Sequence, residues 1–214
     1  ATYTNKQEDV LVKASEKNGS WRQARQAGLL VLAFALQCSL AQADWTLVDE
    51  ESSVQFVSVK NAAIAEVHHF AGMRGGIDAE GAAKVTIDLD SVETLIPIRN
   101  ERMRKMLFET VQFPSATLSV DVPDDLAALA AGETTEIQVP VNVELHGKSK
   151  NYPTRLKATR LVDGALEVAV LEPLVVYAAD FDLAGGVAAL QKIAGLNSIS
   201  TAVPVTARLT FRPE

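Results

Sequence analysis

The segment Glu-Ile-Gln-Val-Pro-Val-Asn-Val-Glu-Leu, residues 136–145, alternates strictly between polar and apolar side chains. Successive side chains of a β-strand point to opposite faces, so this alternation predicts a strand with one buried face and one hydrated face. The same pattern recurs in Lys84–Asp90, Thr117–Val122 and Ala202–Phe211, and more weakly in Ser53–Val59, Arg155–Leu161 and Ala165–Tyr177. The chain therefore repeats one kind of element, the half-buried strand.

Half-buried strands favour an antiparallel sheet, because parallel strands are normally covered on both faces. Strands of nearly ten residues and the lack of regular strand–helix–strand spacing favour a closed barrel over a sandwich. The pair Asp163-Gly164 between two expected strands indicates a hairpin turn. Short helices are expected at Arg99–Phe108, Asp124–Gly132 and Gly186–Ala194. The pattern thus predicts an all-β, antiparallel barrel with short helical insertions.

The beginning of the chain differs from the rest, because residues 27–36 are uncharged and mostly aliphatic. Arg22 and Arg25 precede this run, and Ala41-Gln42-Ala43 follows it. This arrangement is typical of a secretory signal peptide cleaved after Ala43. An uncleaved anchor is the alternative, although the run is shorter than the roughly 20 residues that span a membrane. We expect residues 1–43 to be an N-terminal extension with a signal peptide, and residues 44–214 to be the exported domain.

Charge and cysteine content exclude several function classes. The net charge of −7, which becomes −9 without residues 1–43, argues against nucleic acid as a partner. Cys38 is the only cysteine and lies in the expected signal peptide, so the exported domain has no thiol for a disulfide or a thiolate metal site. Lipid attachment to Cys38 is disfavoured by the bulky Gln37. The sequence also lacks a nucleotide-binding glycine loop and a G-x-S-x-G motif.

The three histidines offer little support for a catalytic or metal site. His68 and His69 are adjacent, so on a strand they point to opposite faces and cannot bind one metal together. His69 and His146 could share a site with an acid such as Glu66 only if the fold brought them together. Ordinary histidines are therefore the expectation, with no metal and no catalytic residue predicted.

Two charged groups each have two interpretations. Asp88, Asp90 and Glu93 could form a carboxylate pair for catalysis, but a solvated strand face explains them as well. The basic residues near position 100 could form a solvated helix face or contact anionic lipid headgroups; they are Arg99, Arg102, Arg104 and Lys105.

Apolar residues offer a further clue, because all three methionines fall near aromatic residues. Met73, Met103 and Met106 accompany Phe70 and Phe108 in the sequence. Methionine adapts to a long flexible ligand, and it fills a protein core equally well. The pattern is compatible with an exported binding protein rather than a catalyst.

The order of segments resembles the YceI-like, or polyisoprenoid-binding, family of bacterial periplasmic proteins. The resemblance covers residues 44–214, and no single segment is diagnostic. It rests on residues 45–49, 53–56, 70–72, 76–77, 90–94, 99–103, 113–117 and 145–150. The chain departs from the family at Lys60-Asn61, where the family often has His, and at residues 177–183, which lack the family's Arg.

The resemblance implies a lipocalin-like, eight-stranded barrel that encloses an elongated apolar cavity in a periplasmic protein. It further implies that the protein carries or stores a long-chain isoprenoid lipid or a quinone-like amphiphile, with no reaction and no cofactor. The residues expected to line the cavity are Phe70, Met103, Met106, Phe108, Phe113 and Phe181. Transient contact with a membrane surface and formation of a homodimer are left open.

Two other functions remain as alternatives. The first is a structural or stress-response interaction protein whose barrel is filled by its own side chains, which a barrel without a continuous cavity would favour. The second is an enzyme that uses His69 or His146 with a nearby carboxylate, which requires these groups to meet in one cleft.

Overall fold

The computed structural model describes residues 44–123, 126 and 128–214 of the chain. The expected signal peptide with Cys38 lies outside the described residues, and so do three residues of the helix expected at Asp124–Gly132. Within the described part, no helix has both the length and the hydropathy required to cross a membrane.

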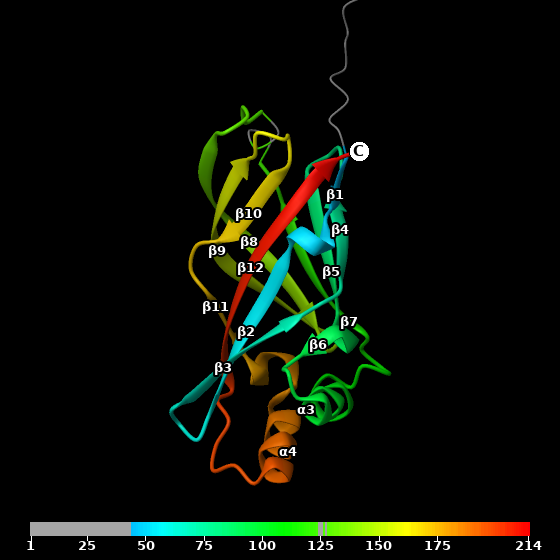
Figure 1. Cartoon of the computed structure of the whole chain (residues 1–214), viewed down its shortest axis with the longest axis vertical. Coiled ribbons are helices and arrows are strands. Elements are labelled where there is room, and N and C mark those ends of the chain that lie inside the picture. The colour runs from blue at the N-terminus through cyan, green and yellow to red at the C-terminus, as the bar shows by residue number, and fades with distance from the viewer. Residues whose placement is uncertain (1–43, 124–125, 127) are drawn as a thin grey trace, which may run out of the picture. The chain divides into compact units, whose positions relative to one another are not determined.

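The strands form one antiparallel sheet that curls around a central axis (Figure 1). In chain order, their bounds are β1 Trp45–Leu47, β2 Ser53–Lys60, β3 Ile64–Phe70, β4 Met73–Ile77, β5 Ala82–Asp88, β6 Val92–Glu93, β7 Ser115–Asp121, β8 Thr134–Leu145, β9 Lys148–Arg160, β10 Leu166–Val170, β11 Leu174–Tyr177 and β12 Ala202–Pro213.

The sheet closes into a barrel because β12 pairs with β10 on one side and with β1 on the other. The closed ring is β1-β4-β5-β7-β8-β9-β10-β12, which makes eight strands, and every neighbouring pair is antiparallel. Further along β12, β2 and β11 take the places of β1 and β10. The all-β, lipocalin-like, eight-stranded antiparallel barrel predicted from the sequence is confirmed.

The strongest strand predictions are confirmed with small differences at their ends. The segment at 84–90 leaves the sheet at Asp88, because the 3-10 turn η2, Leu89–Ser91, begins there and the Asp88 side chain accepts a hydrogen bond from the Asp90 N–H. The segment at 165–177 is two strands, β10 and β11. The Asp163-Gly164 hairpin is confirmed: Gly164 has a φ of 88° and donates its N–H to the Leu161 carbonyl at 3.0 Å.

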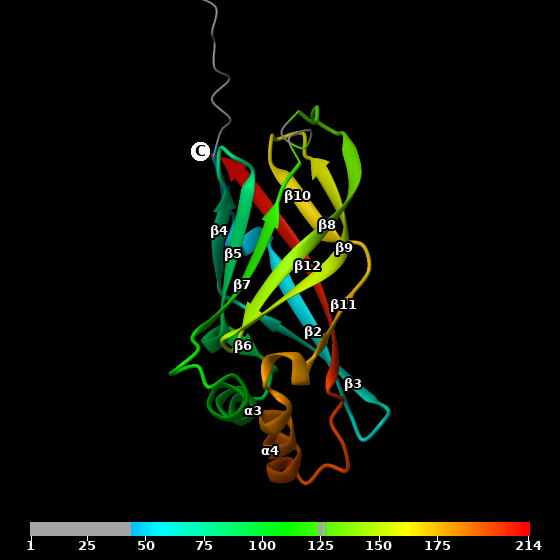
Figure 2. The same ribbon diagram turned by 180° about the vertical axis from the view of Figure 1, so that it is seen from behind.

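The helical insertions gather at one end of the barrel, which we call the helical end (Figures 1 and 2). They are α3 Pro97–Arg102, the π-helical η3 Met103–Phe108, the 3-10 turn η5 Ala178–Phe181 and α4 Ala184–Ala194; a further 3-10 turn, η1 Asp49–Glu51, links β1 to β2. Gly195 ends α4 in a left-handed conformation, with a φ of 64°. Helices are therefore confirmed near both Arg99–Phe108 and Gly186–Ala194.

The core of the barrel is a wall of inward-facing side chains. On β8, Val141 and Val143 are buried, whereas the flanking Gln138 and Glu144 are exposed. Some inward residues, such as Leu118 and Leu209, are only half-buried although they point into the barrel. They remain partly accessible because they face an internal cavity.

Candidate functional site

An apolar cavity of about 240 Å³ lies inside the barrel. Every residue in its wall is apolar except Thr206. A barrel of eight strands has an interior just wide enough to hold one small or slender ligand. The cavity can therefore exclude water from an apolar chain, but it offers almost no polar group along its length.

The cavity is elongated along the barrel. On β12 its wall extends from Val203 to Phe211, which is about 26 Å along a strand and about 20 Å along the axis of a barrel with the usual strand tilt. The wall also contains Leu107 of η3 and Val187 of α4 at the helical end, and Leu126 beyond β7. This form suits a long, thin apolar molecule.

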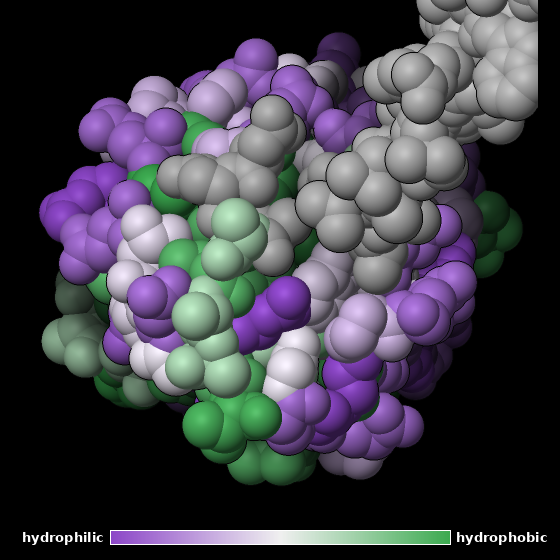
Figure 3. All heavy atoms as spheres, turned by 90° about the horizontal axis from the view of Figure 1, so that it is seen from above, coloured by the Kyte–Doolittle hydropathy of each residue, from purple (hydrophilic) through white to green (hydrophobic). Residues whose placement is uncertain are grey.

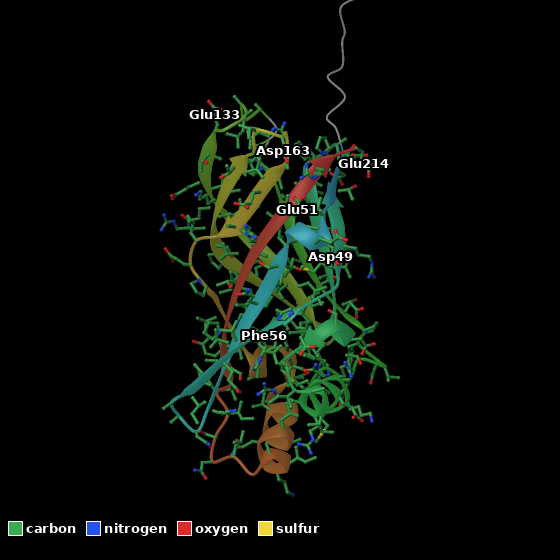
Figure 4. The ribbon with its side chains drawn as sticks, viewed as in Figure 1. Asp49, Glu51, Phe56, Glu133, Asp163 and Glu214 are labelled. Carbon is green, nitrogen blue, oxygen red and sulfur yellow. The ribbon has the colours of Figure 1, made fainter. Side chains whose placement is uncertain are left out.

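The end of the barrel opposite the helices is packed with large side chains. Trp45 is 7% exposed, and the Arg160 guanidinium lies over its ring at 4.3 Å. Seen from this end, hydrophilic residues form most of the margin and hydrophobic residues show between them (Figure 3). Ion pairs from Arg212 to Glu51, at 2.9 Å, and to Asp163, at 3.0 Å, lie near the same end (Figure 4).

Two of the six residues expected to line the cavity belong to its wall. Phe70 on β3 and Phe108 on η3 both line it, and their ring centroids are 5.8 Å apart. Met103 and Met106 lie on η3 outside the wall; Met103 is buried in the core and Met106 is half-buried.

The remaining two expected residues also lie outside the wall. Phe113 packs against the imidazole of His146, with ring centroids 4.2 Å apart. Phe181 is fully buried in η5, where it packs with Val141 and Val143 in a second apolar cluster. A role for these residues in ligand binding stays a prediction.

Much of the wall consists of inward-facing residues of the strands that alternation predicted, although they were not named as site residues. All five inward positions of β12 contribute to it; they are Val203, Val205, Ala207, Leu209 and Phe211. The alternating pattern already carried this signal, because in a hollow barrel the inward face of each strand is also the binding surface. Phe56 on β2 also lines the cavity.

A group of polar residues lies at the helical end, on the inward faces of β2 and β3 and on α3. We call Ser58, Lys60, Glu66, His68 and Arg99 the mouth cluster. The register pairs Phe56 with His68 and Ser58 with Glu66, so these side chains share a face with the cavity-lining Phe56. Figure 4 shows Phe56 on the half of β2 that leads to the helical end.

Ion pairs hold the mouth cluster together. The Glu66 carboxylate Oε2 lies 2.8 Å from Lys60 Nζ and 2.7 Å from Arg99 Nη1. The pair with Glu66 connects α3 to β3, and Arg99 also donates from Nη2 to the carbonyl of Thr94, which follows β6, at 2.7 Å. The hydrogen bond from Lys60, with the adjacent positive charge of Arg99, lowers the pKa of Glu66, so its carboxylate stays charged near neutral pH.

His68 lies beneath these ion pairs and is 3% exposed. Its Nε2 is 3.1 Å from Ser58 Oγ, and its ring meets the Phe56 ring edge-on at 5.3 Å. Burial lowers the pKa of His68, and the positive charges of Arg99 and Lys60 act in the same direction. The imidazole is therefore uncharged near neutral pH.

This lowered pKa predicts a pH dependence of stability. The unfolded chain binds a proton at His68 near the ordinary pKa of about 6.5, whereas the folded protein binds it only at lower pH. Acidification from pH 8 to pH 5 should therefore lower the free energy of unfolding, by at most about 1.4 kcal/mol per pH unit from this residue.

Urea unfolding of the wild type and of His68→Gln across this range measures the effect. The variant should show the weaker pH dependence. His69→Gln, at the exposed neighbouring position, should keep the dependence of the wild type. Identical pH dependence in the wild type and His68→Gln would contradict the assignment.

The groups considered for catalysis are not gathered in one place. Glu66 forms ion pairs with Lys60 and Arg99. His146 lies in the turn between β8 and β9, and its Nε2 is 3.4 Å from Oε2 of Glu109, which follows η3. His69 lies opposite Glu93 in the β3–β6 pairing. Across residues 44–123, 126 and 128–214, no three His, Cys, Asp or Glu side chains are arranged to hold a metal ion.

The two charged groups noted in the sequence have local roles. Asp88 accepts from the Asp90 N–H at 2.9 Å, and Asp90 accepts from the Thr110 hydroxyl at 2.6 Å. Glu93 accepts from the Leu95 N–H. Among the basic residues, Arg99 joins the mouth cluster, Arg104 donates to the Asp90 carbonyl and Lys105 pairs with Glu101.

A closed eight-stranded antiparallel barrel around an elongated apolar cavity defines a lipocalin-like protein. The sequence profile of the YceI-like domain matches residues 45–211. The chain belongs to the YceI-like family.

Solved structures agree with this assignment. A polyisoprenoid-binding domain from Saccharophagus degradans, described as implicated in plant cell wall breakdown, is 39% identical, and the alignment covers 79% of this chain and 98% of that chain, with a TM-score of 0.77. Burkholderia cenocepacia BcnA has the same fold at 17% identity, with coverage of 77% and 98% and a TM-score of 0.59. No protein with a curated description matches the sequence.

Proposed function

We propose that the protein binds a long-chain isoprenoid lipid or a quinone-like amphiphile in the barrel cavity and carries or stores it without catalysis. The observation that supports this most is the cavity itself, which is elongated and whose wall is apolar apart from Thr206. Membership of the YceI-like family and similarity to a polyisoprenoid-binding domain point to the same class of ligand.

The physical driving force for such binding is the removal of apolar surface from water. Each Å² of apolar surface buried contributes about 25 cal/mol. An isoprenoid chain has no polar group that needs a hydrogen-bond partner, so its transfer into an apolar cavity carries no desolvation cost for polar groups. An ionic or strongly hydrated ligand would lose its solvation in the same cavity without compensation.

The proposal includes an exported location and a transient contact with a membrane surface. The signal-like segment at residues 1–43 supports the first. Exposed apolar residues at the start of α3 support the second, because Leu95 is 86% exposed and Ile98 is 51% exposed beside basic residues such as Arg102. Apolar and basic side chains side by side suit an anionic lipid surface.

The two alternatives have weaker support. A barrel filled by its own side chains does not leave an internal cavity of about 240 Å³. An enzyme built on His69 or His146 would need a shared cleft, and His146 is engaged by Glu109 in a turn. Binding of a lipid is the function that the geometry supports best.

An uptake measurement tests the proposal. The purified protein, stripped of lipid by a denaturing wash and refolded, is mixed with vesicles that contain a prenylated benzoquinone and is then separated from them. We expect native mass spectrometry to show one quinone per barrel. A protein that emerges without quinone after incubation would contradict the proposal.

A further inference from the structure

Exposed apolar side chains are concentrated at the helical end. Of the eleven large apolar residues that are exposed among the described residues, six lie in or beside the elements of this end. We call these six the docking face; they are Ile64 at the tip of the β2–β3 hairpin, Leu95 and Ile96 before α3, Ile98 in α3, Val111 after η3 and Ile193 in α4. Exposed apolar groups that gather in one region mark a contact with something outside the chain.

The elements that carry the docking face are joined to one another (Figures 1 and 2). α3 runs directly into η3, and η3 packs against α4. The hairpin tip is attached to the loop after α4, because the Asn61 N–H donates to the Ser198 carbonyl at 2.9 Å. The docking face is therefore one connected region at the end of the barrel.

Leu95 has an unfavourable conformation as well as an unfavourable exposure. Its φ is 62°, in the left-handed region that glycine and asparagine occupy with less strain. Its side chain is 86% exposed, so burial does not explain the choice of leucine. Strained residues of this kind are associated with functional sites, and here the strain presents an apolar side chain to the outside.

The same elements are basic, although the protein is acidic. Residues 97–108 contain four basic side chains and one acidic side chain, and Lys192 is the only charged residue in 183–199, whereas the chain has a net charge of −7. Within the described part of the chain, Arg102, Arg104 and Lys192 form no ion pair with a carboxylate. Their charges are free to attract an anionic surface, which repels the rest of the protein.

The elements of the docking face also close the cavity. Leu107 and Phe108 of η3 and Val187 of α4 belong to the cavity wall. A ligand that leaves the cavity at this end therefore emerges beside the docking face. An isoprenoid chain released anywhere else would expose its apolar surface to water, which is unfavourable.

From these observations we infer that the helical end docks on an anionic bilayer through the docking face, and that the ligand passes between bilayer and cavity without crossing water. The inference rests on the proposed function, whose membrane contact it assigns to six residues and makes the route of transfer. The basic side chains bind lipid headgroups, and the apolar side chains enter the boundary between headgroups and acyl chains.

Charge favours a bilayer over a second copy of the chain as the occupant. In a two-fold symmetric dimer each patch meets its own copy, so the basic side chains of the two subunits would face each other. Like charges brought together in this way oppose association. An anionic bilayer offers the opposite charge to every one of them.

Co-sedimentation of the full chain with vesicles, without added quinone, tests the docking. Vesicles of phosphatidylcholine are compared with vesicles that also contain phosphatidylglycerol. We expect tighter binding to the anionic vesicles, by about fivefold for each basic side chain that reaches the surface. High salt should remove the difference, because it screens exposed charges. Equal binding to both kinds of vesicle at low salt would overturn the inference.

Leu95→Gly separates docking from stability. Glycine adopts the left-handed conformation without strain, so the melting temperature should not fall. Loss of the apolar side chain should nevertheless weaken vesicle binding about tenfold. The matched control is Val162→Gly, because Val162 is 89% exposed next to Asp163 at the opposite end of the barrel (Figure 4), and it should bind vesicles as the wild type does. Unchanged vesicle binding by Leu95→Gly would overturn the docking face.

Reversal of a charge provides a second comparison. Lys192→Glu places a negative charge on α4 and should weaken binding to the anionic vesicles at least about fivefold. Lys84→Glu changes the net charge by the same amount on the exposed outer face of β5, and it should have a much smaller effect. Equal losses in the two variants would show that net charge, and not the docking face, determines binding.

The route of transfer has its own measurement. The protein loaded with a prenylated benzoquinone is mixed with acceptor vesicles, and the rate of quinone transfer is measured at several vesicle concentrations. The rate should rise in proportion to vesicle concentration, and Leu95→Gly should transfer more slowly while its quinone affinity stays unchanged. A rate that is independent of vesicle concentration would show that the ligand first enters water, which would overturn the direct route.

The remaining outcomes separate this inference from the proposed function. A protein that docks on anionic vesicles but takes up no quinone would support the docking face and overturn the proposed function. Sedimentation velocity shows whether a second copy covers the face instead. A dimer that Leu95→Gly dissociates, with vesicle binding unchanged, would overturn the inference.

Discussion

Replacing Ala207 with Trp should abolish uptake of a prenylated quinone while the barrel stays folded. Ala207 lies on β12 opposite Val54, and both side chains line the cavity. An indole at this position would occupy space that the ligand chain needs, in a cavity of about 240 Å³. An aromatic side chain covers roughly 150–250 Å². If the ligand can no longer bury that much apolar surface in the cavity, its binding free energy weakens by about 4–6 kcal/mol.

That loss corresponds to a decrease in affinity of about a thousandfold or more. Arg208→Trp is the matched control, because Arg208 is the next residue and its side chain is 59% exposed outside the barrel. Its ion pair with Glu167, at 3.4 Å, is exposed and contributes little to stability. Isothermal titration with the quinone measures both variants, and wild-type affinity in a folded Ala207→Trp protein would show that the ligand does not occupy the cavity.

Gly186→Ala should destabilise the protein, whereas the same substitution at the neighbouring Gly185 should not. A Cβ on Gly186 would lie 2.6 Å from the Met106 carbonyl oxygen and 2.8 Å from Leu107 Cα, both of which are backbone atoms of η3. Since backbone cannot move aside as a side chain can, α4 would have to shift away from η3. We expect a loss of about 2–3 kcal/mol in the free energy of unfolding, at the upper end for overpacking.

The adjacent glycine supplies the control for this prediction. A Cβ on Gly185 would have no neighbouring atom within 4 Å, so Gly185→Ala meets no obstacle and should stabilise the helix by about 0.5–1 kcal/mol. Thermal unfolding should therefore show a melting temperature about 4–12 °C lower for Gly186→Ala and slightly higher for Gly185→Ala. Equal shifts in the two variants would contradict the close packing of α4 on η3.

The parts of the fold that followed from the sequence are those in which side-chain pattern and environment agree. β8 and β12 have apolar side chains facing the barrel interior and polar side chains facing water, so alternation identified them. The ends of these strands were less certain, because pairing with neighbours far along the chain decides where a strand stops.

β3 was not predicted because its pattern is inverted. Glu66 and His68 face inward, whereas Val67 faces outward and is 64% exposed. A rule that assigns apolar residues to the interior misses such a strand. The inversion arises because two polar members of the mouth cluster, Glu66 and His68, take inward positions on β3.

β4 was missed for a different reason. Its sequence contains Gly75 and Gly76, which have no side chains to alternate. A Cβ on Gly75 would lie 2.0 Å from the Lys84 carbonyl oxygen, and one on Gly76 would lie 2.2 Å from that of Trp45. Close approach of the neighbouring strands requires glycine here, and that requirement becomes visible only when the strand pairing is known.

The candidate site was only partly accessible to sequence reasoning. Phe70 and Phe108 were named, but the mouth cluster joins residues of β2 and β3 to Arg99, which is 33 positions after Glu66. The sequence showed Arg99 as one member of a basic group and Glu66 as a possible partner of histidines. Only the three-dimensional arrangement pairs them and leaves His68 Nδ1 without a partner among the described residues.

The most direct test of the account is to identify what the protein contains when it is purified from the cells that produce it. Organic extraction of the native protein, followed by mass spectrometry, should recover a long-chain isoprenoid lipid or a quinone-like amphiphile, in a ratio near one per barrel. Ala207→Trp, prepared in the same way, should yield none. Recovery of no lipid from the wild type, or of equal amounts from both proteins, would contradict the account.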